Sequence, residues 1–98
     1  MKTFGLEKHQ WKTVENIVLE PLNKKNTQLF VFGSRARNDH KKFSDLDILI
    51  RGKIDDITLS NIKENLENSN LPITVDLVLE KDLAESYKET ILKEMLPV

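Results

Sequence analysis

Two stretches of this chain combine strand-forming apolar residues with aspartate, and they restrict the possible folds more than any other feature. The stretch 44–50 alternates aliphatic side chains with Asp45 and Asp47. The stretch 73–79 does the same around Asp76. Alternation with a period of two indicates β-strands with two distinct faces. Aspartate is disfavoured in strands, and such conflicts with local propensity often mark functional positions.

The chain before these stretches predicts one helix and one strand. Apolar residues recur at spacings of three and four from Trp11 to Leu22, which gives a helix one buried stripe. Pro21 is expected to end this helix near Glu20. The apolar run 29–32 is continuous and rich in β-forming residues, so we expect a strand covered on both faces.

Two more helices are expected, one on each side of the strand that carries Asp76. The first has apolar residues at helical spacing over 59–66, with Asp56 or Thr58 as its N-cap. The second begins at a capping box formed by Asp82 and Glu85. Because a helix joins the two aspartate-bearing strands, we expect them to be parallel neighbours with a right-handed crossover. The class is therefore α/β (α+β), a small mixed sheet of three or more strands with flanking helices.

Length, charge and cysteine content limit the function. With 98 residues, the chain fits one domain spanning 1–98, and its binding site should be an open cleft or a pocket completed by another chain. There is no cysteine, so any metal must bind through oxygen or histidine. Fifteen basic and 16 acidic residues leave no net field to hold a polyanion, so we expect no nucleic-acid partner. Neither a membrane span nor a signal peptide is evident, which indicates a cytoplasmic protein.

The aspartates are the candidate metal ligands. On a strand, Asp45 and Asp47 point the same way, with Cα atoms roughly 6 to 7 Å apart. A neighbouring strand that carries Asp76 would lie about 4.8 Å away, so three carboxylates would face one point. Their repulsion would raise their pKa values, and a hard cation such as Mg²⁺ or Mn²⁺ is the natural partner. The alternative for an isolated Asp-x-Asp pair is a solvent face or a strand entry cap.

A second candidate feature is the Gly33-Ser34 step, which follows the first buried strand. Free backbone N–H groups and the Ser34 hydroxyl could hold phosphate oxygens there, and a plain turn with Ser34 as a helix N-cap is an equal alternative. Arg35 and Arg37 supply positive charge close by, which would neutralise a triphosphate. On position alone, half or more of such arginines are solvent contacts.

Taken together, the stretches 32–37 and 44–50 resemble the Gly-Ser and Asp-x-Asp signature of the polymerase-β-like nucleotidyltransferases, in their minimal single-domain form. The stretch 70–76 is similar to the family's third-carboxylate strand. Two departures stand out. Asn38 replaces a glycine that many relatives carry, and Leu79-Glu80 replaces a polar residue followed by an aromatic.

The resemblance implies a role for each matched residue. Gly33 and Ser34 would hold the nucleotide phosphates, and Asp45 and Asp47 would bind Mg²⁺. Asp76 would complete the metal site and act as the base that readies an acceptor hydroxyl.

The resemblance also implies a partner. Minimal nucleotidyltransferases of this kind resemble one half of toxin–antitoxin pairs whose other half is a helical HEPN-type protein. The expected reaction is transfer of AMP from ATP to a hydroxyl of that partner, with this chain as the antitoxin in a hetero-oligomer. One alternative is a non-catalytic module that neutralises a partner by occlusion, against which the intact aspartates argue. Another is nucleotidyl transfer to RNA or a small molecule, against which the neutral charge and the lack of an acceptor domain count.

Overall fold

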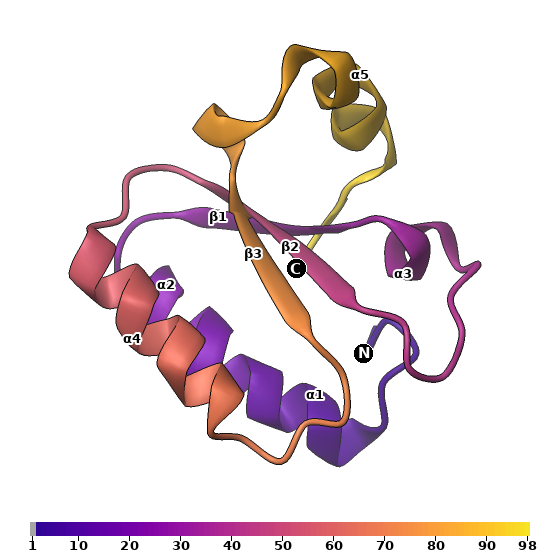
Figure 1. Cartoon of the computed structure of the whole chain (residues 1–98), viewed down its shortest axis with the longest axis vertical. Coiled ribbons are helices and arrows are strands. Elements are labelled where there is room, and N and C mark those ends of the chain that lie inside the picture. The colour runs from indigo at the N-terminus through magenta and orange to yellow at the C-terminus, as the bar shows by residue number, and fades with distance from the viewer. Residues whose placement is uncertain (1) are drawn as a thin grey trace.

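A four-stranded mixed sheet forms the centre of the computed structural model, which describes residues 2–98 (Figure 1). The strands are β1 (Gln28–Phe32), β2 (Leu46–Arg51), β3 (Val75–Leu79) and β4 (Leu96–Pro97), in the order β3-β2-β1-β4. Strand β2 pairs parallel with β3 and antiparallel with β1, while β4 pairs antiparallel with β1. The expected mixed sheet is confirmed, as is the parallel pairing of the two aspartate-bearing strands.

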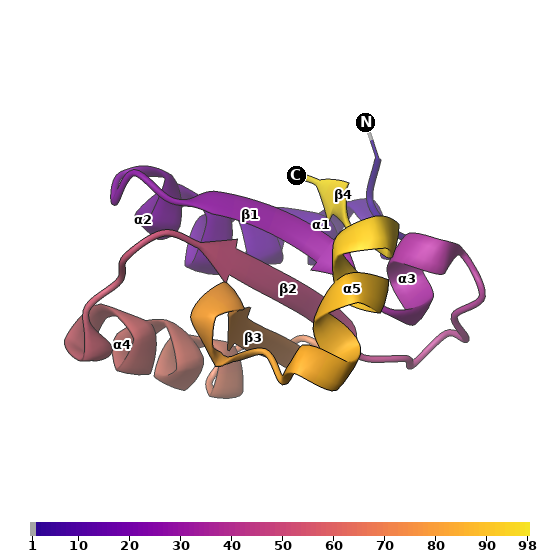
Figure 2. The ribbon, with the colours of Figure 1, turned by 90° about the horizontal axis from the view of Figure 1, so that it is seen from above.

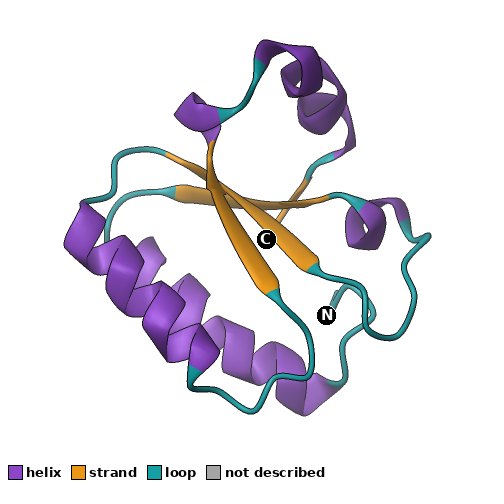
Figure 3. Cartoon of the chain, in the orientation of Figure 1, coloured by secondary structure: helices purple, strands orange, loops and turns teal. Residues whose placement is uncertain are grey.

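Helices flank the sheet unequally, as the secondary-structure colouring also shows (Figure 3). The helical segments are α1 (Lys8–Val14), a π-helical turn (Glu15–Leu19), α2 (Glu20–Asn23), α3 (Ser34–Arg37), α4 (Asp56–Glu67), a 3₁₀ turn (Glu80–Asp82) and α5 (Glu85–Glu94). Figures 1 and 2 place α1, α2 and α4 on one side of the sheet and α5 on the other. Among residues 2–98, no helix is long and apolar enough to span a membrane.

The hydrophobic core lies between the sheet and the α1, α2 and α4 side. Its fully buried members on the sheet are Leu46, Ile48 and Ile50 of β2 and Val31 of β1. They belong to one cluster with Val14 and Val18 of the first helical run. The aspartate of β2 occupies the alternate position on that strand, so it faces away from this core. The fold therefore leaves the aspartate-bearing face of the sheet available for a site.

The first helical run differs from its prediction, because it continues past Pro21 to Asn23. The π-helical turn explains the difference. The N–H of Glu20 bonds to the carbonyl of Glu15, a five-residue step that widens the helix just before the proline. Pro21 then sits in the first turn of α2, where a missing N–H costs little.

Strand β1 is less enclosed than expected. Leu29 and Val31 are buried on one face, whereas Phe30 and Phe32 are only half-buried on the other. The Arg51 guanidinium lies 4.9 Å from the centre of the Phe30 ring and covers part of that second face. The prediction of a strand covered on both faces holds fully for one face only.

The predicted helix caps were wrong in both later helices. Asp55, not Asp56 or Thr58, caps α4, and its carboxylate accepts a 3.0 Å hydrogen bond from the Thr58 N–H. Asp82 lies in the 3₁₀ turn, and the cap position of α5 belongs to Ala84. No residue of α5 is buried, so the expected closing helix is an open element on the surface.

Candidate functional site

Asp47 and Asp76 meet on the face of the sheet opposite the core, near the start of β2 and β3. They are register partners on the parallel strands β2 and β3, so their side chains leave the sheet side by side. Asp47 is also the register partner of Phe32 on β1, the residue immediately before Gly33. One strand position therefore brings the predicted carboxylates next to the predicted phosphate turn.

The environment of Asp47 disfavours its charged form. Its pKa is raised from 3.8 to about 6, first by burial and then by the negative charges of Asp76 and Asp45. The charge of Arg37 opposes the shift. A bound cation would offset this unfavourable environment and stabilise the ionised form of Asp47.

Asp45 stands just before β2 and is exposed. It acts on Asp47 and on Arg35 through its charge. Among residues 2–98, no three carboxylate or imidazole side chains form a ready-made metal cluster. The structure thus brings Asp47 and Asp76 together and leaves Asp45 at the entrance to the strand. The oxygen donors and their mutual repulsion fit a hard cation such as Mg²⁺.

Gly33 makes the turn between β1 and α3, and no other residue fits there. Its φ of 77° and ψ of −157° lie in a region that is essentially restricted to glycine. A β-carbon at this position would also collide with Oδ2 of Asp47. Gly33 occupies the cap position of α3 and Ser34 is its first residue, so the alternative of Ser34 as N-cap was wrong. The close approach leaves the Asp47 carboxylate directly beside the turn.

Arg35 serves a different purpose from the one expected. It is only 2% exposed, and its guanidinium donates to three backbone carbonyls: Ser44 at 3.0 Å, Phe4 at 2.8 Å and Lys42 at 3.2 Å. Burial lowers the pKa of Arg35, and the charge of Asp45 partly opposes this. With its donors engaged in this way, we interpret Arg35 as a clamp that fixes the loop leading to Asp45.

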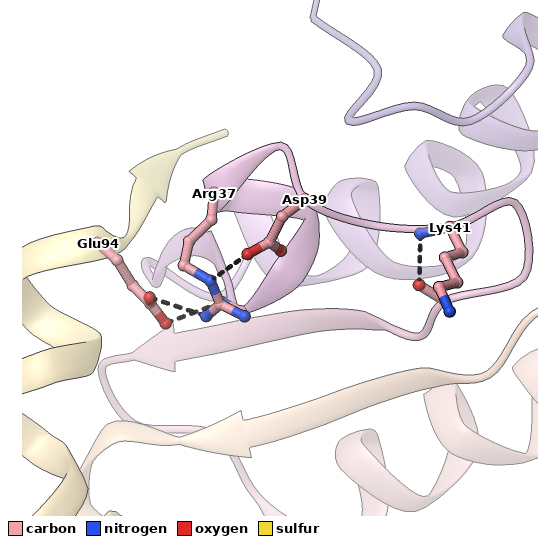
Figure 4. A network of polar contacts seen from close by, with 6 residues as sticks. Arg37, Asp39, Lys41 and Glu94 are labelled. Atoms are coloured by element: carbon pink, nitrogen blue, oxygen red, sulfur yellow. Dashed lines mark hydrogen bonds and ion pairs between the residues drawn. The ribbon is translucent and has the colours of Figure 1, made fainter.

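Arg37 is the arginine that lies on the surface beside the turn (Figure 4). Its Nε donates to Asp39 at 3.1 Å, and its Nη1 donates to Oε2 of Glu94 at 3.0 Å. The other oxygen of Glu94 accepts a 3.1 Å hydrogen bond from the Gly33 N–H. Glu94 belongs to α5, so a residue far along the chain reaches into the predicted phosphate turn.

Asn38 ends α3 in the left-handed conformation, with φ 63° and ψ 31°. Asparagine is one of the few residues that adopt this conformation at low cost. The departure from the glycine of many relatives therefore leaves the turn geometry intact.

Sequence reasoning missed two residues. Glu80, the residue after β3, makes a bidentate ion pair at 2.9 and 2.8 Å with Arg51, the last residue of β2. This pair was foreseeable, because Ile50 and Leu79 are register partners and the next residues must lie side by side. The contact of Glu94 with Gly33 spans 61 residues, and no local pattern announces it.

A groove of about 450 Å³ lies between α4 and β3. Apolar side chains such as Leu66 and Leu71 line it, and Asp76 forms part of its wall. Asp76 is itself exposed, and alternation along β3 directs its side chain to the face opposite Val75 and Leu77, which pack against the core.

Comparison with known proteins identifies the family that most of this chain matches. Residues 11–98 match the family model described as a nucleotidyltransferase domain. Over 67 residues, the chain is 36% identical to the Haemophilus influenzae protein named probable protein adenylyltransferase MntA. That match covers 66% of this chain and 59% of the relative, so the chain spans about three fifths of the length of that protein.

Solved structures share the fold. A protein described as a minimal nucleotidyltransferase superimposes with a TM-score of 0.70 at 28% identity, covering 95% of this chain and 97% of that one. A chain from a toxin–antitoxin crystal structure with AMP-PNP superimposes with a TM-score of 0.62 at 20% identity, covering 85% of this chain and 70% of that one. At that identity the second match supports the fold alone.

Proposed function

This chain belongs to the nucleotidyltransferase domain family, and from that premise we propose that it transfers AMP from ATP to a hydroxyl group of a partner protein in a Mg²⁺-dependent reaction. The observation that carries the proposal is the position of Asp47. It pairs with Asp76 across parallel strands and lies against Gly33 at the end of β1. A phosphate group held at the turn would thus lie beside the carboxylates.

Each side chain has a proposed task. Gly33 and Ser34 bind the phosphates of ATP through a backbone N–H and a hydroxyl, and Arg37 adds positive charge beside them. Asp45 and Asp47 hold the metal, and the raised pKa of Asp47 supports this role because a cation would favour the ionised form. Bound Mg²⁺ would neutralise the carboxylates and polarise the phosphate that is attacked.

Asp76 completes the metal site and accepts the proton of the acceptor hydroxyl. The acceptor oxygen then forms a bond to the α-phosphorus of ATP, and the bond to pyrophosphate breaks on the opposite side. The exposure of Asp76 supports this role, because an acceptor hydroxyl can reach it from solvent. The proton ends on the carboxylate, and pyrophosphate carries away the negative charge.

The proposed acceptor is a helical HEPN-type protein, with this chain as its antitoxin. Three observations support a protein acceptor. The chain has a single small core, its helix α5 has no buried residue, and its net charge of −1 offers little attraction to RNA. The name of the Haemophilus influenzae relative specifies protein adenylyltransferase, and one structural neighbour is a toxin–antitoxin complex.

The test is to incubate the chain with labelled ATP, Mg²⁺ and a HEPN-type partner and to follow label on that partner. We expect transfer by wild type, little or none by Asp45→Asn and Asp47→Asn, and none in EDTA. Asp82→Asn, an exposed aspartate outside the site, is the matched control and should act like wild type. Tight partner binding without transfer from any nucleotide would instead favour neutralisation by occlusion.

A further inference from the structure

Glu94 occupies two of the donors that the proposed function assigns to phosphate, the Gly33 N–H and Arg37 Nη1. One carboxylate oxygen accepts from the Gly33 N–H at 3.1 Å, and the other accepts from Arg37 Nη1 at 3.0 Å. The Glu94 side chain is only 16% exposed, whereas that of Arg37 is 48% exposed. In Figure 4 the carboxylate points from α5 towards α3, directly at the guanidinium.

The fold delivers Glu94 to this position through a short tether. Glu94 is the last residue of α5, and β4 begins two residues later. Strand β4 pairs with β1 at Phe30 and Val31, and the Val98 N–H adds a 3.1 Å bond to the Leu29 carbonyl. The end of α5 is therefore fixed beside the end of β1, where the phosphate turn begins.

The rest of α5 does little to hold the helix in place. None of its residues is buried, and Tyr87 is 65% exposed. An ion pair within α5 joins Lys93 to Glu89, and both of these side chains are exposed. The bonds of Glu94 to the turn are thus a specific contact of an otherwise open helix.

A carboxylate and a phosphate group compete for such donors on equal chemical terms. Both are anions that present several oxygens, and both form charge-assisted hydrogen bonds with backbone N–H groups and guanidinium. Two anions cannot share the same N–H and the same Nη1 at full strength. A phosphate that binds the Gly33 N–H and Arg37 Nη1 must first displace Glu94 from them.

We propose that Glu94 is a built-in competitor for the nucleotide phosphates, which sets the affinity of the site and leaves it closed until ATP or a partner draws the carboxylate away. This rests on the proposed function, because it takes the Gly33 turn as the phosphate site. Rotation of the Glu94 side chain alone would free both donors. A partner that contacts Glu94 would turn the same side chain without moving the end of α5 that β4 fixes, and would thereby affect nucleotide binding.

The experiment measures the Kd of a non-hydrolysable ATP analogue with Mg²⁺ by calorimetry, for wild type, Glu94→Gln, Glu94→Ala and Glu89→Gln. Glu94→Gln keeps the shape of the side chain and removes its charge, while Glu94→Ala removes the competing oxygens. Glu89→Gln removes one carboxylate from the same helix at a site remote from the turn, so it controls for net charge. Thermal melting of each variant checks that it is folded.

We expect both Glu94 variants to bind the analogue about tenfold more tightly than wild type, since the charged Glu94 carboxylate no longer competes for the Gly33 N–H and Arg37 Nη1. Glu89→Gln should match wild type. Binding by the Glu94 variants that is equal to or weaker than that of wild type overturns the proposal and shows that Glu94 positions Arg37 instead. In that case the proposed function still stands, because wild type binds the nucleotide. If none of the four proteins binds the analogue, both the Glu94 proposal and the proposed function are overturned.

Discussion

Gly33 and Asp47 lie so close together that a β-carbon on Gly33 would collide with the carboxylate oxygen Oδ2 of Asp47. The antiparallel register of β1 and β2 sets this contact, because Asp47 lies opposite Phe32. The two halves of the sequence signature are therefore one structural unit. Neither the turn nor the carboxylate can change without affecting the other.

Gly33→Ala should lower both stability and activity. The backbone conformation at Gly33 costs about 1 to 3 kcal/mol for a residue with a β-carbon, and the collision would displace Asp47 from its position beside the turn. Gly52→Ala is the matched control, because Gly52 also has a positive φ, of 120°, but lies by Thr27 and away from the carboxylates. Urea denaturation should show losses for both variants. Only Gly33→Ala should lose AMP transfer, and equal transfer by the two would contradict the account.

Asp47→Asn should be more stable than wild type at neutral pH and inactive. The pKa of Asp47 is raised from 3.8 to about 6, so the folded state holds this proton more tightly than the unfolded chain does. The contribution of Asp47 to stability is therefore complete below about pH 4 and is lost as pH rises through about 6. In EDTA, the free energy of unfolding should be larger for the variant than for wild type near neutral pH. The two values should converge near pH 4.

Magnesium should reverse that order. If Asp47 binds the cation, Mg²⁺ stabilises wild type and acts much less on Asp47→Asn. Thermal melting with and without Mg²⁺ measures the difference. If Mg²⁺ raised the melting temperature of both proteins by the same amount, Asp47 would not be a metal ligand.

Arg35→Ala should be strongly destabilising. It would leave the carbonyls of Phe4, Lys42 and Ser44 without their donor in a site that is nearly closed to water, at a cost of roughly 2 to 4 kcal/mol. Arg37→Ala removes two ion pairs of a surface arginine and should cost clearly less than Arg35→Ala. Urea denaturation of the two variants compares them. Similar losses would mean that Arg35 does not clamp the loop.

Asn38→Gly should be tolerated, whereas Asn38→Val should cost about 1 to 2 kcal/mol. The left-handed backbone at Asn38 suits glycine and asparagine and disfavours a β-branched side chain. Thermal melting is sufficient to rank the three proteins. A valine variant as stable as wild type would show that the turn can rearrange.

The central sheet was predictable from sequence because its signals are local. Alternation around Asp47 and Asp76 identified β2 and β3, and the helix between them required a parallel crossover. Their side-by-side position then followed from register. The placing of Gly33 next to these carboxylates was suggested by the family resemblance, and the structure adds the contact with Asp47.

The remaining differences arise from interactions that no local pattern encodes. Pro21 was expected to end a helix, but the π-helical turn before it absorbs the missing hydrogen bond. Arg35 was assigned to phosphate from its position in the motif. It is instead buried, and its guanidinium donates to three backbone carbonyls. Glu94 reaches the turn only because β4 folds back onto β1. The metal-binding roles of Asp45, Asp47 and Asp76 stay predictions.

The most direct test of the account is the intact mass of a HEPN-type partner after incubation with ATP, Mg²⁺ and each of four forms of this chain. Wild type and Asp82→Asn should increase the mass of the partner by one or more AMP units. Asp47→Asn and Asp76→Asn should leave it unchanged, because they remove the pair of carboxylates that faces the Gly33 turn. Modification of the partner at an undiminished rate by Asp47→Asn and Asp76→Asn would contradict the assignment of the site.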